Sequence, residues 1–209
     1  MSKLGIYAML AGHDKKYSSF RGKVGTVAQN LMKRDFVSPG YMRKAGTDVT
    51  EFKFDWGKVY LSPIIDFYND EILSYSVSTS PNMKMIIDML DGLYEKHPLT
   101  NCLMLQSDQG WQYQMKPYQQ SLQSHGIIQS MSRKGNCLDN SKTENFFSIL
   151  KKEMFYGHEN DFHSFEEFRE AIDKYIEWFN TKRIVSRLGK APAACRGIVS
   201  IPLLCYSSI

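Results

Sequence analysis

Three consecutive runs of β-forming residues, joined by very short connections, constrain the fold more than any other feature. The runs are 47–54, 58–68 and 71–78, and they are rich in β-branched and aromatic residues. Only Asn69–Asp70 separates the second run from the third, which is typical of a tight turn. Strands joined so closely pair antiparallel. The sequence therefore predicts a three-stranded antiparallel unit, with Pro63 indicating an edge or a bulge in its second strand.

Helix-like and strand-like patterns alternate along the remainder of the chain. Apolar residues recur at helical spacing in four stretches and form short runs in two others. The expected helices are 80–97, 116–126, 141–156 and 164–183, and the expected strands are 101–107 and 127–131. The element order is β-β-β-α-β-α-β-α-α. It predicts an α/β fold in which a five-stranded mixed sheet, its first three strands antiparallel, is flanked by helices.

Capping signals mark the starts of three of these helices. Ser80 is the expected N-cap of the first helix, and Asp139 or Asn140 can cap the third. The last helix opens with Ser164 and Glu167 at the spacing of a capping box.

Length and composition exclude several classes of protein. A chain of 209 residues with 43% hydrophobic residues suits one domain with a real core. No stretch approaches the roughly 18–20 apolar residues of a membrane span, and the start shows no convincing signal peptide. The four cysteines are scattered without a C-x-x-C pair, which favours reduced thiols. We expect a cytoplasmic protein that does not contact a membrane.

The positive charge is concentrated at the N-terminal end. Residues 1–44 hold nine Lys or Arg and two Asp, a sum of +7, so the remaining residues carry 4 − 7 = −3. A basic segment ahead of a near-neutral domain is consistent with a polyanionic partner. A solvated basic leader accounts for the same charge equally well.

Three carboxylates occupy distinctive places on the expected elements. Asp48 lies in the first strand, Asp108 ends the fourth strand in "SDQGWQYQ", and Glu144 lies in the first turns of the third helix. Each alone is more often a turn or surface residue. Together they could converge, since the first and fourth strands can be neighbours and the helix can cross them. Clustered carboxylates repel each other unless cations such as Mg²⁺ or Mn²⁺ hold them, and two such ions suit phosphoryl transfer.

Four blocks of sequence resemble the DDE catalytic core of bacterial insertion-sequence transposases and retroviral integrases. "GTDVTEF" resembles the block of the first aspartate, and "SDQGWQYQ" the block of the second. "SMSRKGNCLDNSKTENFFSILKKE" resembles the glutamate block, and 35 residues (144 − 108 − 1) separate its glutamate from Asp108. "YIEWFNTKRIVSRLGKAPAA" resembles the closing segment. The resemblance covers residues 46–195.

The resemblance implies an RNase H-like fold and metal-dependent cleavage and joining of DNA strands at insertion-sequence ends. It implies that Asp48, Asp108 and Glu144 are the catalytic residues and the ligands of Mg²⁺ or Mn²⁺, with two ions expected. DNA, both transposon ends and target, would be the partner, and a homo-oligomer would form the synaptic complex at the bacterial nucleoid. No P-loop is present, so no nucleotide cofactor is expected.

The same resemblance divides the chain into three parts. Residues 1–44 are expected to be a basic linker left from an N-terminal DNA-binding region, and residues 45–183 the catalytic core. Residues 184–209 are expected to form an atypical C-terminal tail, whose last part, Cys195–Ile209, does not look like the family's ending.

Seven further residues are candidates for DNA contact. For each lysine on the glutamate's helix a solvated face is an equal alternative, whereas contact is favoured for the two cations of "SRKGN", where Gly135 allows a close approach of the backbone. Aromatic residues are more often part of a core. The candidates are Trp111, Arg133, Lys134, Asn140, Lys142, Lys151 and Lys152.

Two other functions remain open from the sequence. An RNase H-like nuclease would cut DNA without joining it, and an inactive transposase remnant would only bind DNA.

Overall fold

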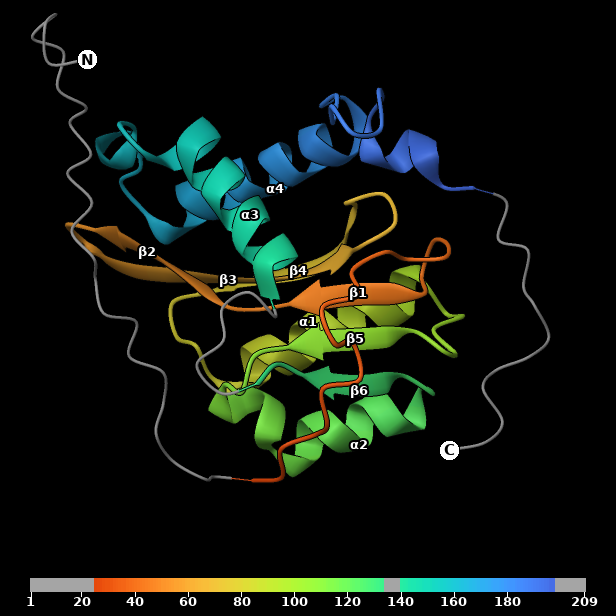
Figure 1. The fold of residues 1–209 in the computed structure, drawn as a ribbon. Helices are drawn as coiled ribbons and strands as arrows, with labels where there is room; N and C mark the ends of the chain where they lie inside the picture. The colour runs from red at the N-terminus through yellow and green to blue at the C-terminus, as the bar shows by residue number, and fades with distance from the viewer. Residues whose placement is uncertain (1–24, 134–139, 198–209) are drawn as a thin grey trace, which may run out of the picture.

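A mixed β-sheet forms the centre of the molecule (Figure 1). The computed structural model describes residues 25–133 and 140–197. The strands are β1 (Lys44–Thr47), β2 (Thr50–Phe54), β3 (Gly57–Asp66), β4 (Ile72–Ser78), β5 (Met104–Ser107) and β6 (Ile128–Met131). Strand β3 pairs antiparallel with β4 on one side and with β1 and β2 on the other. Strands β1, β5 and β6 run parallel. The predicted α/β fold is confirmed.

The first expected strand is interrupted, so the sheet has six strands where five were predicted. Strand β1 ends at Thr47 and β2 begins at Thr50, and both pair with the same edge of β3. The prediction that Asp48 lies inside a strand is therefore wrong, because Asp48 lies in the break. Extending the register from Thr47↔Ile64 places Asp48 opposite Pro63, which has no N–H to donate to the ladder.

Pro63 thus interrupts the neighbouring strand and does not mark an edge. Strand β3 has partners on both sides, and a register shift between Ile64 and Ile65 lies directly beside the proline. Of the two expected roles of Pro63, the edge is wrong and the bulge is confirmed.

The helices follow the predicted order. They are α1 (Met83–Lys96), α2 (Lys116–Ser124), α3 (Ser141–Leu150) and α4 (Phe165–Thr181). A short 3₁₀ turn, η2 (Trp111–Gln114), precedes α2, and a π turn, η4 (Lys151–Phe155), continues α3. Single 3₁₀ turns also occur at η5 (Glu159–Asp161) and η6 (Pro192–Cys195).

The capping predictions have mixed outcomes. Ser164 is confirmed as the N-cap of α4, since its Oγ accepts from Glu167 N, whereas Glu167 Oε2 accepts from the N–H of His163 and not from that of Ser164. Ser80 does not cap α1. Asn82 does, and its side chain accepts from Met85 N.

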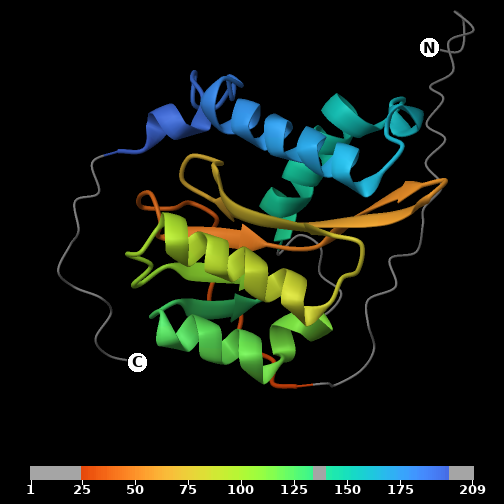
Figure 2. The ribbon, with the colours of Figure 1, turned by 180° about the vertical axis from the view of Figure 1, so that it is seen from behind.

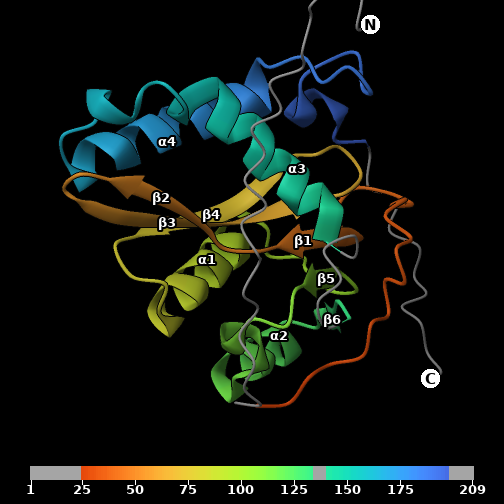
Figure 3. The same ribbon diagram turned by 60° about the vertical axis from the view of Figure 1, so that its left-hand side comes forward.

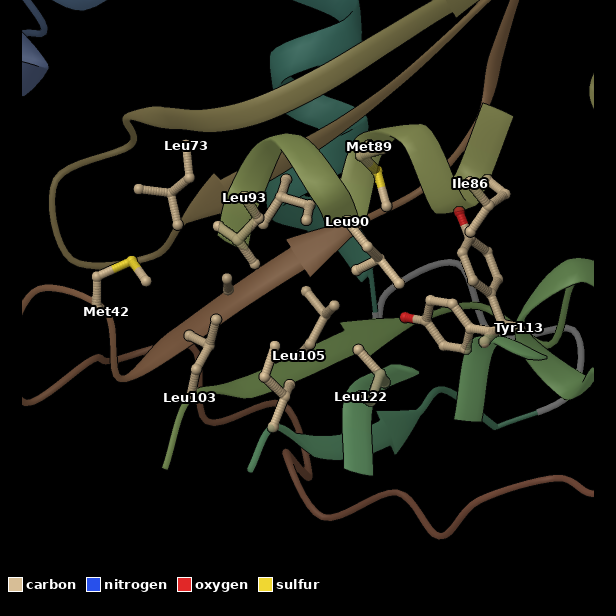
Figure 4. Close-up of a cluster of buried hydrophobic side chains, with 14 of the residues drawn as sticks. Met42, Leu73, Ile86, Met89, Leu90, Leu93, Leu103, Leu105, Tyr113 and Leu122 are labelled. Carbon is tan, nitrogen blue, oxygen red and sulfur yellow. The ribbon is translucent and has the colours of Figure 1, made fainter. Parts of the chain in front are cut away.

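Each face of the sheet buries its own core. Helices α1 and α2 cover one face, as the view from behind shows (Figure 2), and the side chains between them and the sheet form one cluster (Figure 4). Helices α3 and α4 cover the other face with a second cluster that includes Phe52, Leu61 and Phe168. The alternation of side chains along β1 and β3 therefore decides which helix layer each residue meets.

Segments outside the expected core also pack against it. Met32 is buried, and the backbone N–H groups of Leu31 and Met32 donate to Ser130 Oγ on β6. At the other end, the carbonyl of Pro192 accepts from Asn69 in the β3–β4 turn. Figure 3 shows the segment after α4 (dark blue) above the segment that precedes β1 (orange).

Two expectations from composition bear on the described part of the chain. Within residues 25–133 and 140–197, no helix is both long and apolar enough to cross a membrane. Cys195 is a free thiol, but Cys102 is disulfide-bonded. The expectation of reduced thiols is therefore wrong at Cys102, because scattered cysteines give no pairing signal in a single sequence. Cys137 and Cys205 lie outside the described residues.

Candidate active site

Two of the three candidate carboxylates leave the sheet side by side. Strands β1 and β5 are parallel neighbours with Gly46 opposite Gln106. Two residues further along, the backbone that leaves each strand reaches an aspartate, which is Asp48 after β1 and Asp108 after β5. Because parallel strands end at the same edge of a sheet, both side chains lie at its carboxyl edge, where sites on α/β sheets are built.

The backbone holds both aspartates in place. Asp48 Oδ1 accepts from the N–H of Val49 at 2.7 Å, within the break between β1 and β2. Asp108 Oδ1 accepts from the N–H of Gly110 at 2.8 Å, in the turn that leads into η2. A Cβ at Gly110 would lie 2.8 Å from that same carboxylate oxygen, so a side chain there would displace it.

Helix α3 brings the third carboxylate toward this edge. It crosses β1 at Gly46, where an added Cβ would lie 2.7 Å from Thr143 Oγ1 and 2.6 Å from a ring carbon of Phe67. The missing side chain lets the helix lie directly on the strand. Glu144 follows Thr143 in the first turn of α3 and is exposed.

The three carboxyl groups affect each other electrostatically. Burial, the nearby Asp108 and Glu144 raise the pKa of Asp48 to about 8. Burial and the charge of Asp108 also raise the pKa of Glu144. Each charge therefore makes the next ionisation harder, as expected for acids that share one site. Within the described residues, however, no three His, Cys, Asp or Glu side chains are close enough to form a ready-made metal site.

Asn140 links the start of α3 to this cluster. Its Nδ2 donates to Asp48 Oδ2 at 3.1 Å, so the residue expected to cap the helix makes no side-chain cap bond. Asn140 Oδ1 and Thr143 Oγ1 are buried without a hydrogen-bond partner among the described residues. An all-oxygen donor set with raised pKa values and unsatisfied acceptors fits a hard divalent cation such as Mg²⁺. Asp139, the other expected cap, lies outside the described residues.

Two of the candidate lysines for DNA contact are engaged within the chain. Lys142 Nζ donates to the carbonyl of Phe67 at 2.6 Å, and Lys151 Nζ donates to the carbonyl of Glu51 at 3.0 Å. Burial lowers the pKa of both lysines. Their stems thus tie α3 to the sheet.

The other candidates lie at different depths. Lys152 and Arg133 are exposed, Trp111 is partly buried at the start of η2, and Asn140 is buried. Lys134 lies outside the described residues.

From the sequence, Tyr113 could stack near bases or pack in the core, and the structure places it in the core. It is 1% exposed in the core beneath η2, and burial raises its pKa well above the ordinary value, with Asp48 and Asp108 adding to the effect. No local sequence pattern distinguishes Tyr113 from the other aromatic residues, because its proximity to the two aspartates arises only when the chain folds.

Comparisons with known proteins agree with this geometry. Two family models, both described as "Integrase core domain", match residues 41–137 and 144–197. An uncharacterized transposase-like protein of Haemophilus influenzae is 46% identical over 183 residues, which cover 87% of this chain and 83% of that protein. This chain belongs to the integrase-core family of insertion-sequence transposases.

Named relatives in the family are longer than this chain. InsK of Escherichia coli (strain K12), named for insertion sequence element IS150, is 47% identical over 189 residues, or 90% of this chain and 66% of its own length. InsF of the same organism, named as the transposase for IS3, is 32% identical over 78% of this chain and 57% of its own length. The chain thus spans less than two thirds of either transposase.

Solved structures confirm the RNase H-like fold of the integrase-core family. A chain of the simian T-cell lymphotropic virus intasome superposes with a TM-score of 0.67 at 14% identity, over 88% of this chain and 63% of that one. The HTLV-2 integrase catalytic core domain, solved in complex with magnesium, superposes with a TM-score of 0.61 at 18% identity, over 76% and 99%.

Proposed function

We propose that this chain is the catalytic core of a transposase that cleaves and joins DNA strands at the ends of an insertion sequence. The parallel register that sets Asp48 beside Asp108 is the observation that carries the proposal. The raised pKa values of Asp48 and Glu144, to which the charge of Asp108 contributes, support it. The insertion-sequence transposases among its relatives give the reaction class.

The three carboxylates would hold Mg²⁺ or Mn²⁺, and we propose two ions. When bound, such ions activate an attacking oxygen and stabilise the leaving oxygen of a phosphodiester. The HTLV-2 integrase core was solved in complex with magnesium, which supports the choice of ion.

The chain's own groups prepare the site for that cation. The amide of Asn140 and the N–H of Val49 fix the two oxygens of Asp48 in direction. The N–H of Gly110 does the same for one oxygen of Asp108. Glu144 lies on the exposed first turn of α3 and would supply the third carboxylate from the solvent side, where a long polymer can approach. Such preorganisation lowers the cost of bringing three like charges together.

The proposal extends to partners and to the place of action. Relatives of the fold were solved as an intasome and as a dimeric catalytic core, so we propose that two or more copies assemble on DNA. Transposition acts on the chromosome, so we propose that the chain works in the bacterial cytoplasm at the nucleoid. The division into linker 1–44, core 45–183 and tail 184–209 also stays a proposal.

The decisive experiment replaces Asp108 by Ala. We expect loss of Mn²⁺-dependent nicking of supercoiled plasmid, by about 10³-fold or more, with DNA affinity unchanged. Asp91→Ala, an exposed acid on α1, is the matched control and should keep full activity. Cleavage retained in Asp108→Ala would exclude these carboxylates as the catalytic set.

Two further measurements separate the remaining alternatives. A nuclease that does not join DNA would give no product with pre-cleaved ends and a target plasmid, whereas a transposase core gives joined strands. An inactive remnant would bind no Mn²⁺, so calorimetric titration with Mn²⁺ should show binding that Asp108→Ala weakens.

A further inference from the structure

A cleft of about 840 Å³ opens at the start of α3, the helix that carries Glu144. Its walls come from three parts of the chain that are distant in sequence: segment 34–38, the turn after β3, and segment 187–197. Lys142, in the first turn of α3, lines the cleft where these segments meet the helix.

Basic side chains dominate the lining of this cleft. Arg34, Lys142, Arg187, Lys190 and Arg196 line it, against a single acid, Asp35. Asp35 is itself paired with Lys44, and behind the wall Asp70 and Glu71 pair with the lining cations. Counting these three acids against the five cations and Lys44 gives 6 − 3 = +3. Among the ion pairs of the described residues, the cations of the cleft therefore outnumber the acids.

The ion pairs hold the carboxylates behind the arginines. The Glu71 side chain is 2% exposed, while its partner Arg196 is 51% exposed. The Asp70 side chain is 27% exposed, while its partner Arg187 is 51% exposed. Each guanidinium is thus anchored along one edge and open to solvent along the rest. Arginines fixed in this way lose less entropy when they bind an oxyanion.

The remaining walls are apolar and partly exposed. Val37 is 79% exposed and Tyr68 is 36% exposed. The Phe36 ring packs edge-on against Phe67 at 5.6 Å between ring centroids. A cationic rim over an apolar and aromatic wall suits a chain of sugars and bases joined by phosphates.

We propose that this cleft binds the sugar–phosphate backbone of DNA and extends the substrate path beyond the carboxylates. This inference rests on the proposed function, because it treats the cleft and the active site as parts of one DNA track. Lys142, which lines the cleft, and Glu144 lie two residues apart in the first turn of α3, so one helix start serves both sites. That continuity favours DNA over an acidic peptide, which would have no reason to approach the carboxylates.

The test replaces two exposed cations and measures the salt dependence of DNA binding. In the full chain, Arg187→Gln/Lys190→Gln is compared with Lys84→Gln/Lys174→Gln, a double change of exposed lysines on α1 and α4. The probe is a fluorescein-labelled duplex of mixed sequence, and anisotropy gives the Kd from 50 to 300 mM NaCl. Thermal melting confirms that every variant is folded.

We expect the cleft variant to bind DNA about 5-fold or more weakly at 0.1 M salt. The slope of log K against log salt should fall by about 1 to 2, one for each lost phosphate contact. The control should match the unmodified chain in both quantities. Equal affinity and equal slope in the cleft variant would overturn the inference.

Two additional measurements separate DNA from an acidic protein segment, and the cleft from the active site. If the cleft variant keeps its DNA affinity but loses binding to labelled poly-glutamate, the cleft takes an acidic protein segment and the inference is refuted. Asp108→Asn tests the proposed function separately, since it should abolish cleavage while keeping the salt slope. A dead Asp108→Asn together with normal DNA binding by the cleft variant would reject the cleft alone.

Discussion

The charge of Asp48 is costly to accommodate in the folded chain. It is partly buried in the break between β1 and β2, and Asp108 lies on the neighbouring strand. Both effects favour the protonated carboxyl and raise its pKa from 3.8 to about 8. Between these two values the folded chain binds a proton that the unfolded chain has lost. Without a divalent cation, the free energy of unfolding therefore falls as the pH rises from about 4 to about 8.

Asp48→Asn should remove this pH dependence. In EDTA, we expect the variant to gain roughly 3–4 kcal/mol over the unmodified chain between pH 5 and pH 8, since Asn carries no charge to desolvate and each pH unit counts about 1.4 kcal/mol. Thermal or urea unfolding at several pH values measures the gain. Asp91→Asn is the control, and its free energy of unfolding should depend on pH in the same way as that of the unmodified chain. A constant difference between Asp48→Asn and the unmodified chain at every pH would contradict the assignment.

Gly46 is a second residue at which the structure predicts a clear loss of stability on substitution. Gly46→Ala should destabilise the fold by about 1–3 kcal/mol, because the new methyl group overlaps Phe67 and Thr143 and pushes α3 off β1. Gly40→Ala is the control, since its Cβ would meet only Arg43 at an ordinary 3.9 Å. Urea unfolding compares the two, and an equal effect would mean that α3 does not rest on Gly46.

Helix starts supply the test at the scale of single elements. Asn82→Ala should cost about 1 kcal/mol, because the N–H of Met85 loses its acceptor at the first turn of α1. Ser80→Ala should be nearly neutral, although Ser80 was the predicted cap. The free energies of unfolding from urea titration decide between them, and the reverse order would show that α1 begins earlier.

The element order was predictable from periodicity, but several boundaries were not. Alternation and helical spacing report which side of an element is buried, and both are local properties. The break at Asp48 depends on Pro63, fifteen residues away, and appears only when the two strands are paired. The π turn after Leu150 and the choice of Asn82 over Ser80 likewise depend on packing that no single stretch encodes.

The candidate site was predictable only in part for the same reason. Asp48, Asp108 and Glu144 followed from spacing and motif context, whereas the link between Asn140 and Asp48 required the folded chain. Lys142 and Lys151 looked like surface cations, but their stems lie against the sheet and their ammonium groups bind backbone carbonyls. A sequence pattern reports the charge of a side chain and not its direction.

At the scale of the whole molecule, the ends of the described chain are held to the centre by charge. Arg196 binds Glu71, which is 1% exposed at the start of β4. This ion pair joins the segment after α4 to the β3–β4 turn, and Arg187 makes a more exposed pair with Asp70 nearby. The family-model match reaches residue 197, in agreement with a tail that is part of the folded unit.

Removing the arginine that pairs with the buried Glu71 should therefore cost more than removing the one that pairs with the more exposed Asp70. Arg196→Met should destabilise the chain by roughly 2–4 kcal/mol, because it leaves Glu71 buried without its cation. Arg187→Met should cost less than about 1 kcal/mol, since Asp70 keeps Lys142 as a partner. Thermal unfolding at low salt compares them, and similar losses would mean that segment 187–197 contributes little to stability.

The parallel pairing of β1 and β5 has one more consequence. Adjacent strands in any β-sheet lie about 4.8 Å apart, a spacing dictated by the hydrogen bonds of the peptide backbone and not by side chains. The paired residues Gly46 and Gln106, two positions before the aspartates, are therefore held at a spacing that substitutions elsewhere in the sheet cannot change while the strands stay paired. Glu144 lies on a helix, and no strand pairing fixes its distance from the aspartates. Its position is therefore the one of the three that a mutation or a bound duplex can adjust.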